Sequence, residues 1–461
     1  MNEPAHYSRR AAIRSGCSLS CGTPERQRFD ISLTSRPRTS SIDATSPSPS
    51  PRRYRLRMRI SRRPVVYLAL AVAVAVTPAA ARAQNGEDGP ARPRDAGPSG
   101  RVDVRHLSDT LQMILLGGVR DSAFPGAIAV VGTRDGVLAQ VAAGHIDWSP
   151  SPAPTPTTLW DLASLTKVVA LTSAMLQLVD ADMVDLDAPV QRYLPLFTGP
   201  RKEQVTIRHL LTHSSGLPAW RPLYKETATP AEALSLVYAT PLDTLPGVRM
   251  VYSDLGAILL GEVVRVVSGE SLEAYAAAHV FGPLGMRDTQ YRPSETLRWR
   301  IAPTEIDPWR QRHLRGEVHD ENAFALGGIS AHAGLFSTAD DLVRLARAYL
   351  GGGTVDGARV FSSAAIETFT HVQNRALSNR ALGWETATGG NSAGHGMSSR
   401  AFGHTGFTGT SIWIDPENNV FVILLTNRVN PTREHRAIGG VRVAVADAAM
   451  AAIGGRARTT Q

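Results

Sequence analysis

The chain has 461 residues and is 43% hydrophobic, enough for one large domain or for two to three ordinary domains with a sizeable core. Its net charge of +8 would suit a nucleic-acid partner, but the excess lies at the start of the chain. Residues 1–57 hold 11 Arg and 4 acidic residues, and residues 58–83 hold 4 Arg and no acidic residue. The net charge of residues 84–461 is therefore −3. A slightly acidic body argues against a protein that binds the phosphate backbone of nucleic acid.

The first segment, 1–57, is rich in Ser, Arg and Pro, and we expect a mis-called or disordered extension without a fold. Both cysteines, Cys17 and Cys21, lie in it; without further Cys or a nearby His they make a poor metal site. The rest of the chain carries no cysteine, which excludes disulfides, thiol catalysis and cysteine-bound metals there.

Residues 58–83 have the pattern of a secretory signal peptide. A basic start precedes an apolar run from Val65 to Val76, which is too short to span a bilayer comfortably, and the segment ends in Ala81-Arg82-Ala83. Met58 is then the expected initiator, and the mature protein is expected to be exported to the periplasm or the medium.

A flexible Pro- and Gly-rich linker is predicted over 84–101, before a folded region over 102–455 and a tail over 456–461. The folded region begins with a predicted helix across 103–117 and a hairpin across 126–144, which turns at Arg134-Asp135-Gly136.

A helix is predicted next over 162–180, because apolar residues recur on one face at helical spacing. The middle, about 190–310, is dominated by helical patterns and Pro-rich connections, and includes a helix ending at Gly269. A later helix is expected to start after Ser337, with Asp340 completing a capping box.

Two strands around Asp415-Pro416-Glu417-Asn418-Asn419 and a helix over about 435–452 close the region. Strands and helices at both ends of a helical middle predict an α/β (α+β) domain with a helical insertion.

Ser164 begins the helix predicted over 162–180, and Lys167 follows at i+3 on the same face. A serine hydroxyl needs a base within hydrogen-bond reach before it can act as a nucleophile, and a neutral lysine amine can be that base. Only three of the chain's 49 Lys and Arg residues are lysine, and lysine, unlike arginine, can lose its proton in a suitable setting. Alone, the Ser-x-x-Lys pair is a weak signal, and a structural coincidence is the better explanation in a chain of this length.

Two further segments carry candidate chemistry. Tyr252 and Asp254 stand directly before a predicted helix, where a tyrosine near an ammonium can serve as general base and Asp254 can instead be a helix cap. His404-Thr405-Gly406 is placed at the entry to a strand, where backbone N–H groups could complete an oxyanion hole or simply form a tight turn.

Together these segments resemble the serine β-lactamase and penicillin-binding protein superfamily, which is marked by the order Ser-x-x-Lys, Tyr-x-Asn, Lys-Thr-Gly. The chain is most similar to the class C-related branch, which includes D,D-carboxypeptidases, D-aminopeptidases and esterases. The likeness runs from about Val102 to Ile453 and includes "FPGAIAVV", "LWDLASLTKVVA" and "GHTGFTGTSIWIDPENNVFVILLTNRVNP".

The resemblance implies an antiparallel sheet flanked by helices, with the helical region inserted. It also implies that Ser164 is acylated, that Lys167 helps to activate it, and that Tyr252 exchanges protons with the nucleophile and the leaving group. Backbone N–H groups of Ser164 and Phe407 would hold the oxyanion, with Thr405 and Gly406 beside the substrate. No metal and no cofactor is implied.

Two positions depart from the family pattern. Asp254 replaces the Asn, and an ionised Asp cannot donate to a substrate carbonyl. It could pair with Lys167 and raise the pKa of that lysine, which would leave Tyr252 as the base. His404 replaces the Lys of Lys-Thr-Gly, so the permanent positive charge that would bind a substrate carboxylate is replaced by a titratable group. Efficient β-lactamase action is thereby put in doubt.

The favoured interpretation is an exported serine hydrolase, a D,D-carboxypeptidase or endopeptidase, with small cell-wall-type peptides or peptidoglycan fragments as partners. An esterase of the same fold, a class C-like β-lactamase and a non-catalytic peptidoglycan-binding module are the alternatives. Arg428 could receive a substrate carboxylate or remain a solvated side chain. Neither nucleic acid nor, once the signal is removed, a membrane span is expected.

Overall fold

A computed structural model describes residues 102–454. The extension over 1–57, the signal peptide over 58–83, the linker over 84–101 and the tail over 456–461 lie outside the described residues and stay predictions. No helix within the described range is both long enough and apolar enough to cross a membrane.

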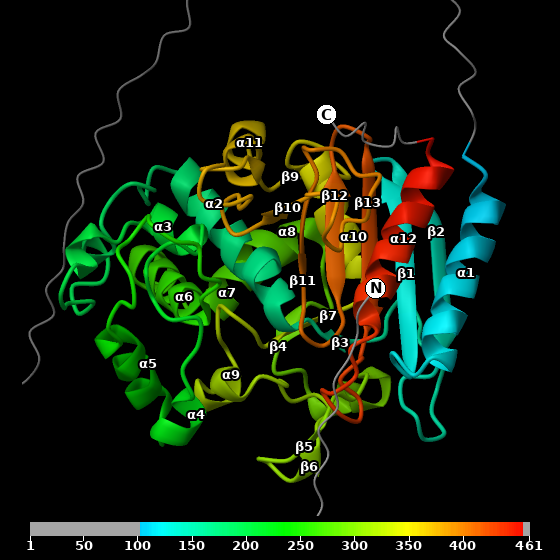
Figure 1. The fold of residues 1–461 in the computed structure, drawn as a ribbon, viewed down its shortest axis with the longest axis horizontal. Helices are drawn as coiled ribbons and strands as arrows, with labels where there is room; N and C mark the ends of the chain where they lie inside the picture. The colour runs from blue at the N-terminus through cyan, green and yellow to red at the C-terminus, as the bar shows by residue number, and fades with distance from the viewer. Residues whose placement is uncertain (1–101, 455–461) are drawn as a thin grey trace, which may run out of the picture. The chain divides into compact units, whose positions relative to one another are not determined.

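The central element is a six-stranded antiparallel sheet in the order β10-β11-β12-β13-β1-β2 (Figure 1). The bounds are β1 Gly126–Thr133, β2 Gly136–Gly144, β10 Glu385–Thr386, β11 Phe402–Thr405, β12 Ser411–Asp415 and β13 Val420–Thr426. The predicted hairpin over 126–144 and the predicted pair of late strands are both confirmed. Strand β1 pairs with β13, so the first and last strands of the chain are neighbours within the sheet.

Side chains alternate between the two faces of the sheet and feed two separate cores. On β1, Ile128 and Val130 belong to the larger core, whereas Ala127, Ala129 and Val131 belong to the smaller one. Helices α1 (Val104–Arg120) and α12 (Ile438–Ala452) cover the face with the smaller core, and α10 (Ala339–Leu350) packs against the other (Figure 1). Both predicted terminal helices are confirmed within a few residues.

Apart from α6, the remaining helices are short. They are α2 Ser173–Asp180, α3 Ile207–Leu211, α4 Leu223–Glu226, α5 Pro230–Ala239, α6 Asp254–Ser268, α7 Leu272–Ala276, α8 Gly282–Leu284, α9 Glu321–Ala325 and α11 Ser363–Thr370. Short strands complete the list: β3 Trp160–Asp161, β4 Gln290–Tyr291, β5 Ile306–Asp307, β6 Arg312–His313, β7 Leu335–Ser337, β8 Thr354–Val355 and β9 Ala358–Arg359. Helices α3 to α6 lie together on the side of the sheet away from α1 (Figure 1).

Two helix starts differ from expectation in an instructive way. The predicted capping box at Ser337 and Asp340 is wrong by one residue, because Ser337 ends β7 and Thr338 is the N-cap, accepting from the Asp341 N–H. Helix α6 is capped by Ser253, not by Asp254, and ends at Gly269, which takes a left-handed φ of 77°. The Asp254 carboxylate is therefore not used as the helix cap.

Candidate active site

Ser164 lies in a distorted turn and not in the regular helix predicted over 162–180. A 3-10 turn over Ala163–Leu165 is followed by a π-helical turn over Lys167–Thr172, and α-helix begins only at Ser173. Ala163 has a φ of 48°, a strained value for a residue with a side chain. Its N–H donates to the buried Asp161 carboxylate over 2.8 Å, which holds this turn in place.

Lys167 is almost fully buried beneath Ser164, and three acceptors surround its ammonium group. The Nζ atom lies 3.1 Å from Ser164 Oγ, 2.9 Å from the His332 carbonyl oxygen and 2.7 Å from Asp254 Oδ1. Burial by itself would lower the pKa of Lys167, but the Asp254 carboxylate, with Tyr252 beside it, outweighs burial and raises that pKa. Lys167 therefore rests as a cation that donates to Ser164 Oγ and to the His332 carbonyl and forms an ion pair with Asp254.

The Tyr252 ring lies between cations and imidazoles. The Lys167 ammonium is 5.0 Å and the Arg380 guanidinium 5.3 Å from its centroid, and the rings of His213 and His404 lie at 4.5 and 5.8 Å. Its hydroxyl is buried and makes no hydrogen bond within residues 102–454. A buried hydroxyl without a partner there is placed to accept or donate a proton in a reaction.

The two imidazoles are neutral near pH 7. Burial first, and then the positive charges of Arg380 and Lys167, lower the pKa of both His213 and His404 well below the ordinary value. His404 Nδ1–H donates to the Thr405 carbonyl oxygen over 2.8 Å, which leaves Nε2 unprotonated. The expected titratable cation at this position is therefore absent near neutral pH.

His404 and Thr405 are the last two residues of strand β11. The prediction that they lie at the start of a strand is therefore wrong. The chain then turns over 406–410 towards β12, and the backbone N–H groups of Ser164 and Phe407 donate to no other described residue. The two N–H groups predicted to hold an oxyanion thus have no acceptor among residues 102–454. Gly406 has no room for a side chain, since an added Cβ would lie 2.1 Å from Thr410 Oγ1 and 2.4 Å from the Leu162 carbonyl oxygen.

Two threonine hydroxyls join the turn over 406–410 to the turn that carries the nucleophile. Thr408 Oγ1 donates to the Asp161 carbonyl over 2.7 Å, and Thr410 Oγ1 donates to the Leu162 carbonyl over 3.0 Å. These contacts fix the Phe407 N–H relative to Ser164. Sequence reasoning missed both residues, although their Thr-x-Thr spacing places both hydroxyls on one side of the turn.

Two arginines hold the same turn from its other side. Arg442 of α12 donates to the carbonyls of Gly406 and Thr410 over 2.7 and 2.8 Å. Arg428 Nε donates to the Phe407 carbonyl over 2.7 Å. Arg428, expected either to receive a substrate carboxylate or to be solvated, is 8% exposed and gives its donors to backbone carbonyls.

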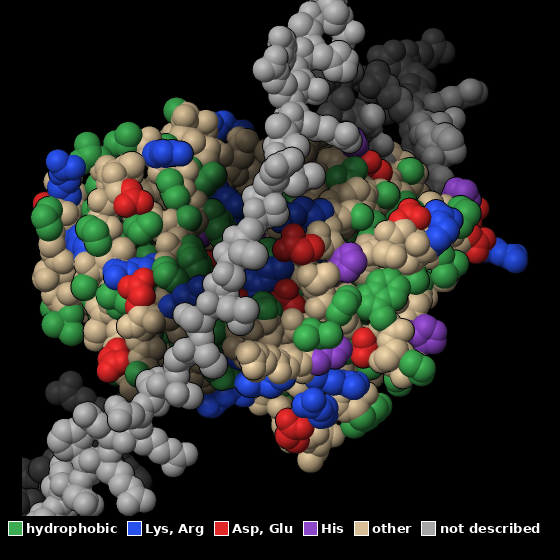
Figure 2. All heavy atoms as spheres, turned by 60° about the horizontal axis from the view of Figure 1, so that its bottom comes forward, with side chains coloured by type: hydrophobic (Ala, Val, Ile, Leu, Met, Phe, Trp, Pro, Cys, Tyr) green, Lys and Arg blue, Asp and Glu red, His purple; other side chains and the backbone are tan. Residues whose placement is uncertain are grey.

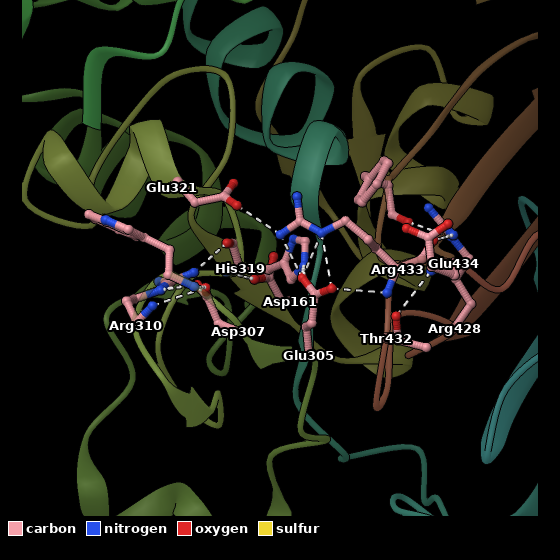
Figure 3. Close-up of polar contacts among 12 residues, drawn as sticks. Asp161, Glu305, Asp307, Arg310, His319, Glu321, Arg428, Thr432, Arg433 and Glu434 are labelled. Carbon is pink, nitrogen blue, oxygen red and sulfur yellow. Dashed lines mark hydrogen bonds and ion pairs between the residues drawn. The ribbon is translucent and has the colours of Figure 1, made fainter. Parts of the chain in front are cut away.

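Phe407 is further held through its ring, which stacks on His319 at 5.7 Å and lies 4.4 Å from the Arg428 guanidinium. Figure 3 shows His319 between Asp161 and Glu305, with Arg433 beyond. The His319 N–H donates to Asp161 over 2.7 Å, and its Nε2 lies 2.9 Å from Glu305. Burial alone would raise the pKa of Glu305, but His319 and Arg433 lower it to about 2, so this buried carboxylate stays ionised.

Ser164 and Tyr252 open into a cavity of about 480 Å³. Its wall includes Thr405, Gly406 and Phe407, one acidic residue, and four arginines, namely Arg380, Arg428, Arg436 and Arg442. Figure 2 shows Lys and Arg side chains gathered, with acidic ones beside them, across the middle of the face that it presents.

Arg380 is the arginine that stands out in this wall. No carboxylate of the described residues lies within 4 Å of it, and its Nη1 is buried without a hydrogen-bond partner. Arg428 and Arg442 also lack a carboxylate partner, but both donate to backbone carbonyls, although Arg442 Nε is buried without a partner. The cavity thus offers, in Arg380, a cation whose side chain has neither a hydrogen bond nor an ion pair with the described residues, which the sequence did not indicate. No three His, Cys, Asp or Glu side chains of the described part are placed to share a metal ion.

Known proteins were compared with this chain, and several are similar to it in sequence. The model of the β-lactamase family matches residues 104–446. A candidate D-alanyl-D-alanine carboxypeptidase of Escherichia coli (strain K12) is 33% identical over 302 residues, 59% of this chain and 69% of that protein. An N-acetylmuramyl-L-alanine amidase of Bacillus subtilis (strain 168) is 34% identical over 350 residues, 67% of this chain and 78% of that protein.

Solved structures show the same fold. EstCE1, a hydrolase with promiscuous acyltransferase activity, gives a TM-score of 0.63 at 21% identity, over 76% of this chain and all of that one. A penicillin-binding protein homologue from Caulobacter crescentus gives 0.62 at 20% identity, over 75% of this chain and 97% of that one. The expected β-lactamase/transpeptidase-like fold is confirmed.

Proposed function

Since the chain belongs to the β-lactamase family and is a serine hydrolase of that fold, we propose that it is a D,D-carboxypeptidase or endopeptidase acting on cell-wall peptides. The observation that carries the proposal is the unpaired Arg380 in the wall of the cavity that holds Ser164. A peptide that ends in a free carboxylate would satisfy this cation, whereas a neutral ester would leave it unpaired. The names of the two curated relatives also point to bonds of the cell wall.

The proposed chemistry follows from the positions of the side chains. Ser164 Oγ attacks the carbonyl carbon, its proton passes to the phenolate form of Tyr252, and the oxyanion is held by the N–H groups of Ser164 and Phe407. Tyr252 then gives the proton to the departing amine, and an acyl-enzyme remains on Ser164. A water molecule repeats the sequence and releases the acid. Lys167 stays an ammonium throughout and holds Oγ at 3.1 Å.

The test is the intact mass of the protein after brief incubation with a penicillin, beside Ser164→Ala. We expect a lasting adduct on the wild type alone, together with release of D-alanine from an N-acetylated peptide ending in D-Ala-D-Ala. The names of the relatives suggest two bonds, the D-alanyl-D-alanine bond and the N-acetylmuramyl-L-alanine bond. Cleavage of both should be followed by incubating the enzyme with intact muropeptides. An adduct on Ser164→Ala would overturn the assignment of the nucleophile.

An esterase is the second candidate, because neutral His404 supplies no charge where the family pattern has lysine. Hydrolysis of short p-nitrophenyl esters without any action on D-Ala-D-Ala peptides would favour it. Rapid hydrolysis of the penicillin without an adduct would instead favour a β-lactamase, and the absence of all turnover would favour a binding module.

We also propose that the protein is exported. The proposal rests on the basic, apolar and small-residue pattern of residues 58–83. Fractionation of cells that produce the full chain tests it, with sequencing of the mature N-terminus. The expected result is a periplasmic or secreted protein that begins near Gln84; a cytoplasmic protein that retains residues 58–83 would contradict it.

A further inference from the structure

Four aromatic side chains form a row beside the active site, here called the aromatic strip: Trp220, Tyr224, Trp309 and Phe324. Successive ring centroids lie 6.3, 4.7 and 5.8 Å apart. The two tryptophans are 47% and 41% exposed. Only 6% of the residues of this chain are aromatic, so a partly exposed row of four calls for a ligand or a packing reason.

The inner side of the strip is rigid. Arg310 is 3% exposed at its side chain, and its guanidinium lies 5.7 Å from the Trp309 ring and 5.0 Å from the Phe324 ring. The donors of Arg310 are taken by Asp307, Glu317 and two backbone carbonyls, and Figure 3 shows its link to Asp307. The rings are therefore supported from beneath while the tryptophans present surface to solvent, which is a pre-organised arrangement.

One end of the strip adjoins the catalytic residues. The Asp254 N–H donates to the Ala219 carbonyl over 2.9 Å, and Ser253 Oγ donates to the Pro218 carbonyl over 2.7 Å. Trp220 is the next residue along the chain. A substrate that leaves the catalytic cavity on this side would therefore meet the strip.

The other end borders a second cavity of about 530 Å³, because Phe324 lines its wall. That wall also holds Arg292, Arg298, Arg312 and Arg315 but only two carboxylates, those of Glu295 and Glu317. Arg315 donates only to the backbone carbonyls of Ile301 and Trp299. Glu273, Glu295 and Glu317 pair with Arg292, Arg298 and Arg312, so the excess of positive charge in this wall rests on Arg315.

An aromatic row that ends at a basic cavity fits a sugar chain with acidic substituents. The C–H groups of a pyranose face are apolar and slightly positive, and they pack on the negative faces of aromatic rings. An apolar helix or a second copy of a hydrophobic surface would cover the strip but leave Arg315 without an anionic partner. We infer that the strip and the second cavity bind the glycan part of a muropeptide, an N-acetylated hexosamine chain that carries carboxylates. The inference rests on the proposed function and extends it to a sugar-linked substrate.

The first test compares two substrates that share one peptide, free or attached to a disaccharide of N-acetylglucosamine and N-acetylmuramic acid. For Trp309→Ala we expect the ratio of kcat/KM for the attached over the free peptide to fall by about tenfold, through KM, from the loss of one stacking contact. Trp299→Ala is the matched control, because Trp299 is 70% exposed and belongs to neither the strip nor the cavity wall. An unchanged ratio in Trp309→Ala would overturn the inference and leave the proposed function intact.

The second test needs no turnover. A peptide-free oligosaccharide of the same two sugars is titrated calorimetrically into Ser164→Ala and into Ser164→Ala with Trp220→Ala or Trp309→Phe, whose smaller change protects the fold. We expect weaker binding to both double variants and to a carboxyl-reduced oligosaccharide. No binding to Ser164→Ala, or stronger binding of the free peptide at the strip, would overturn the inference. Binding without hydrolysis of any peptide would support the glycan site and refute the proposed function.

Discussion

The two cations that flank the Tyr252 ring have opposite surroundings. Lys167, beneath the nucleophile, is almost fully buried and has three acceptors within 3.1 Å. Arg380, in the cavity wall, is half-buried and has no carboxylate partner among residues 102–454. Both lie close to 5 Å from the same ring. The difference indicates separate roles. Lys167, whose acceptors are all within the protein, orders the buried groups around it, whereas Arg380, which has no such partner, is available to a ligand.

The largest expected effect, on kcat, comes from removing the ammonium group of Lys167. Lys167→Met should lower kcat by about 10³-fold or more, because Ser164 Oγ loses its donor and Asp254 loses its partner. Stability should also fall, by about 3 kcal/mol, since half of a buried ion pair remains. Acylation rates and urea denaturation measure the two effects. Lys225→Met, at an exposed lysine, is the control, and a loss of similar size there would remove the distinction.

Substitution of Arg380 should instead affect the discrimination between substrates. Arg380→Gln should reduce the preference for a peptide with a free C-terminal carboxylate over its amide by about 10- to 100-fold, the range of a charged hydrogen bond. The ratio of kcat/KM for acid and amide measures it. Arg359→Gln, at an exposed arginine of β9, provides the comparison. Equal losses on acid and amide would mean that Arg380 only supports Tyr252.

The pH dependence tests what holds the charge on Lys167. The Asp254 carboxylate raises the pKa of Lys167 and so keeps the ammonium form at high pH. In Asp254→Asn burial is no longer outweighed, the pKa of Lys167 falls, and the alkaline limb of the kcat profile should move to lower pH. At neutral pH we expect about a tenfold loss of kcat. An unchanged profile would show that Asp254 does not control the charge on Lys167.

The smallest effect concerns the link between the two turns. Thr408→Val and Thr410→Val keep the side-chain shape but remove the hydroxyls that reach the Asp161 and Leu162 carbonyls. Each should lower kcat about three- to tenfold with little change in KM, because the Phe407 N–H shifts relative to Ser164. Thr388→Val, at an exposed threonine, is the control. A rise in KM at constant kcat would place these threonines in substrate binding.

The sequence predicted those features that depend on local pattern. Ser164, Lys167 and Tyr252 stand in short ordered motifs, and the hairpin over 126–144 follows from alternation and turn residues. The structure brings these residues together with Asp254, His404 and Phe407. The π-helical turn at Lys167–Thr172 escaped prediction because tertiary contacts, and not helix propensity, set its geometry.

Residues that act over long sequence distances were missed. Arg442 reaches a turn 32 to 36 residues away, and Thr408 reaches Asp161 across 247 residues. No local pattern marks such pairs, because the sheet order that joins them is a property of the whole domain. The charge state of His404 escaped for a related reason, since it is set by burial and by Arg380.

The pairing of β1 with β13 has a consequence for the order of events during synthesis. Ser164 and Lys167 leave the ribosome long before residues 406–426, yet the free N–H of Phe407 and the sheet position that carries it exist only once β13 has paired. A nascent or truncated chain would hold the nucleophile without the means to stabilise an oxyanion. Hydrolytic activity is thereby postponed until residues 406–426 have been synthesised, and a premature stop before residue 400 yields an inert product.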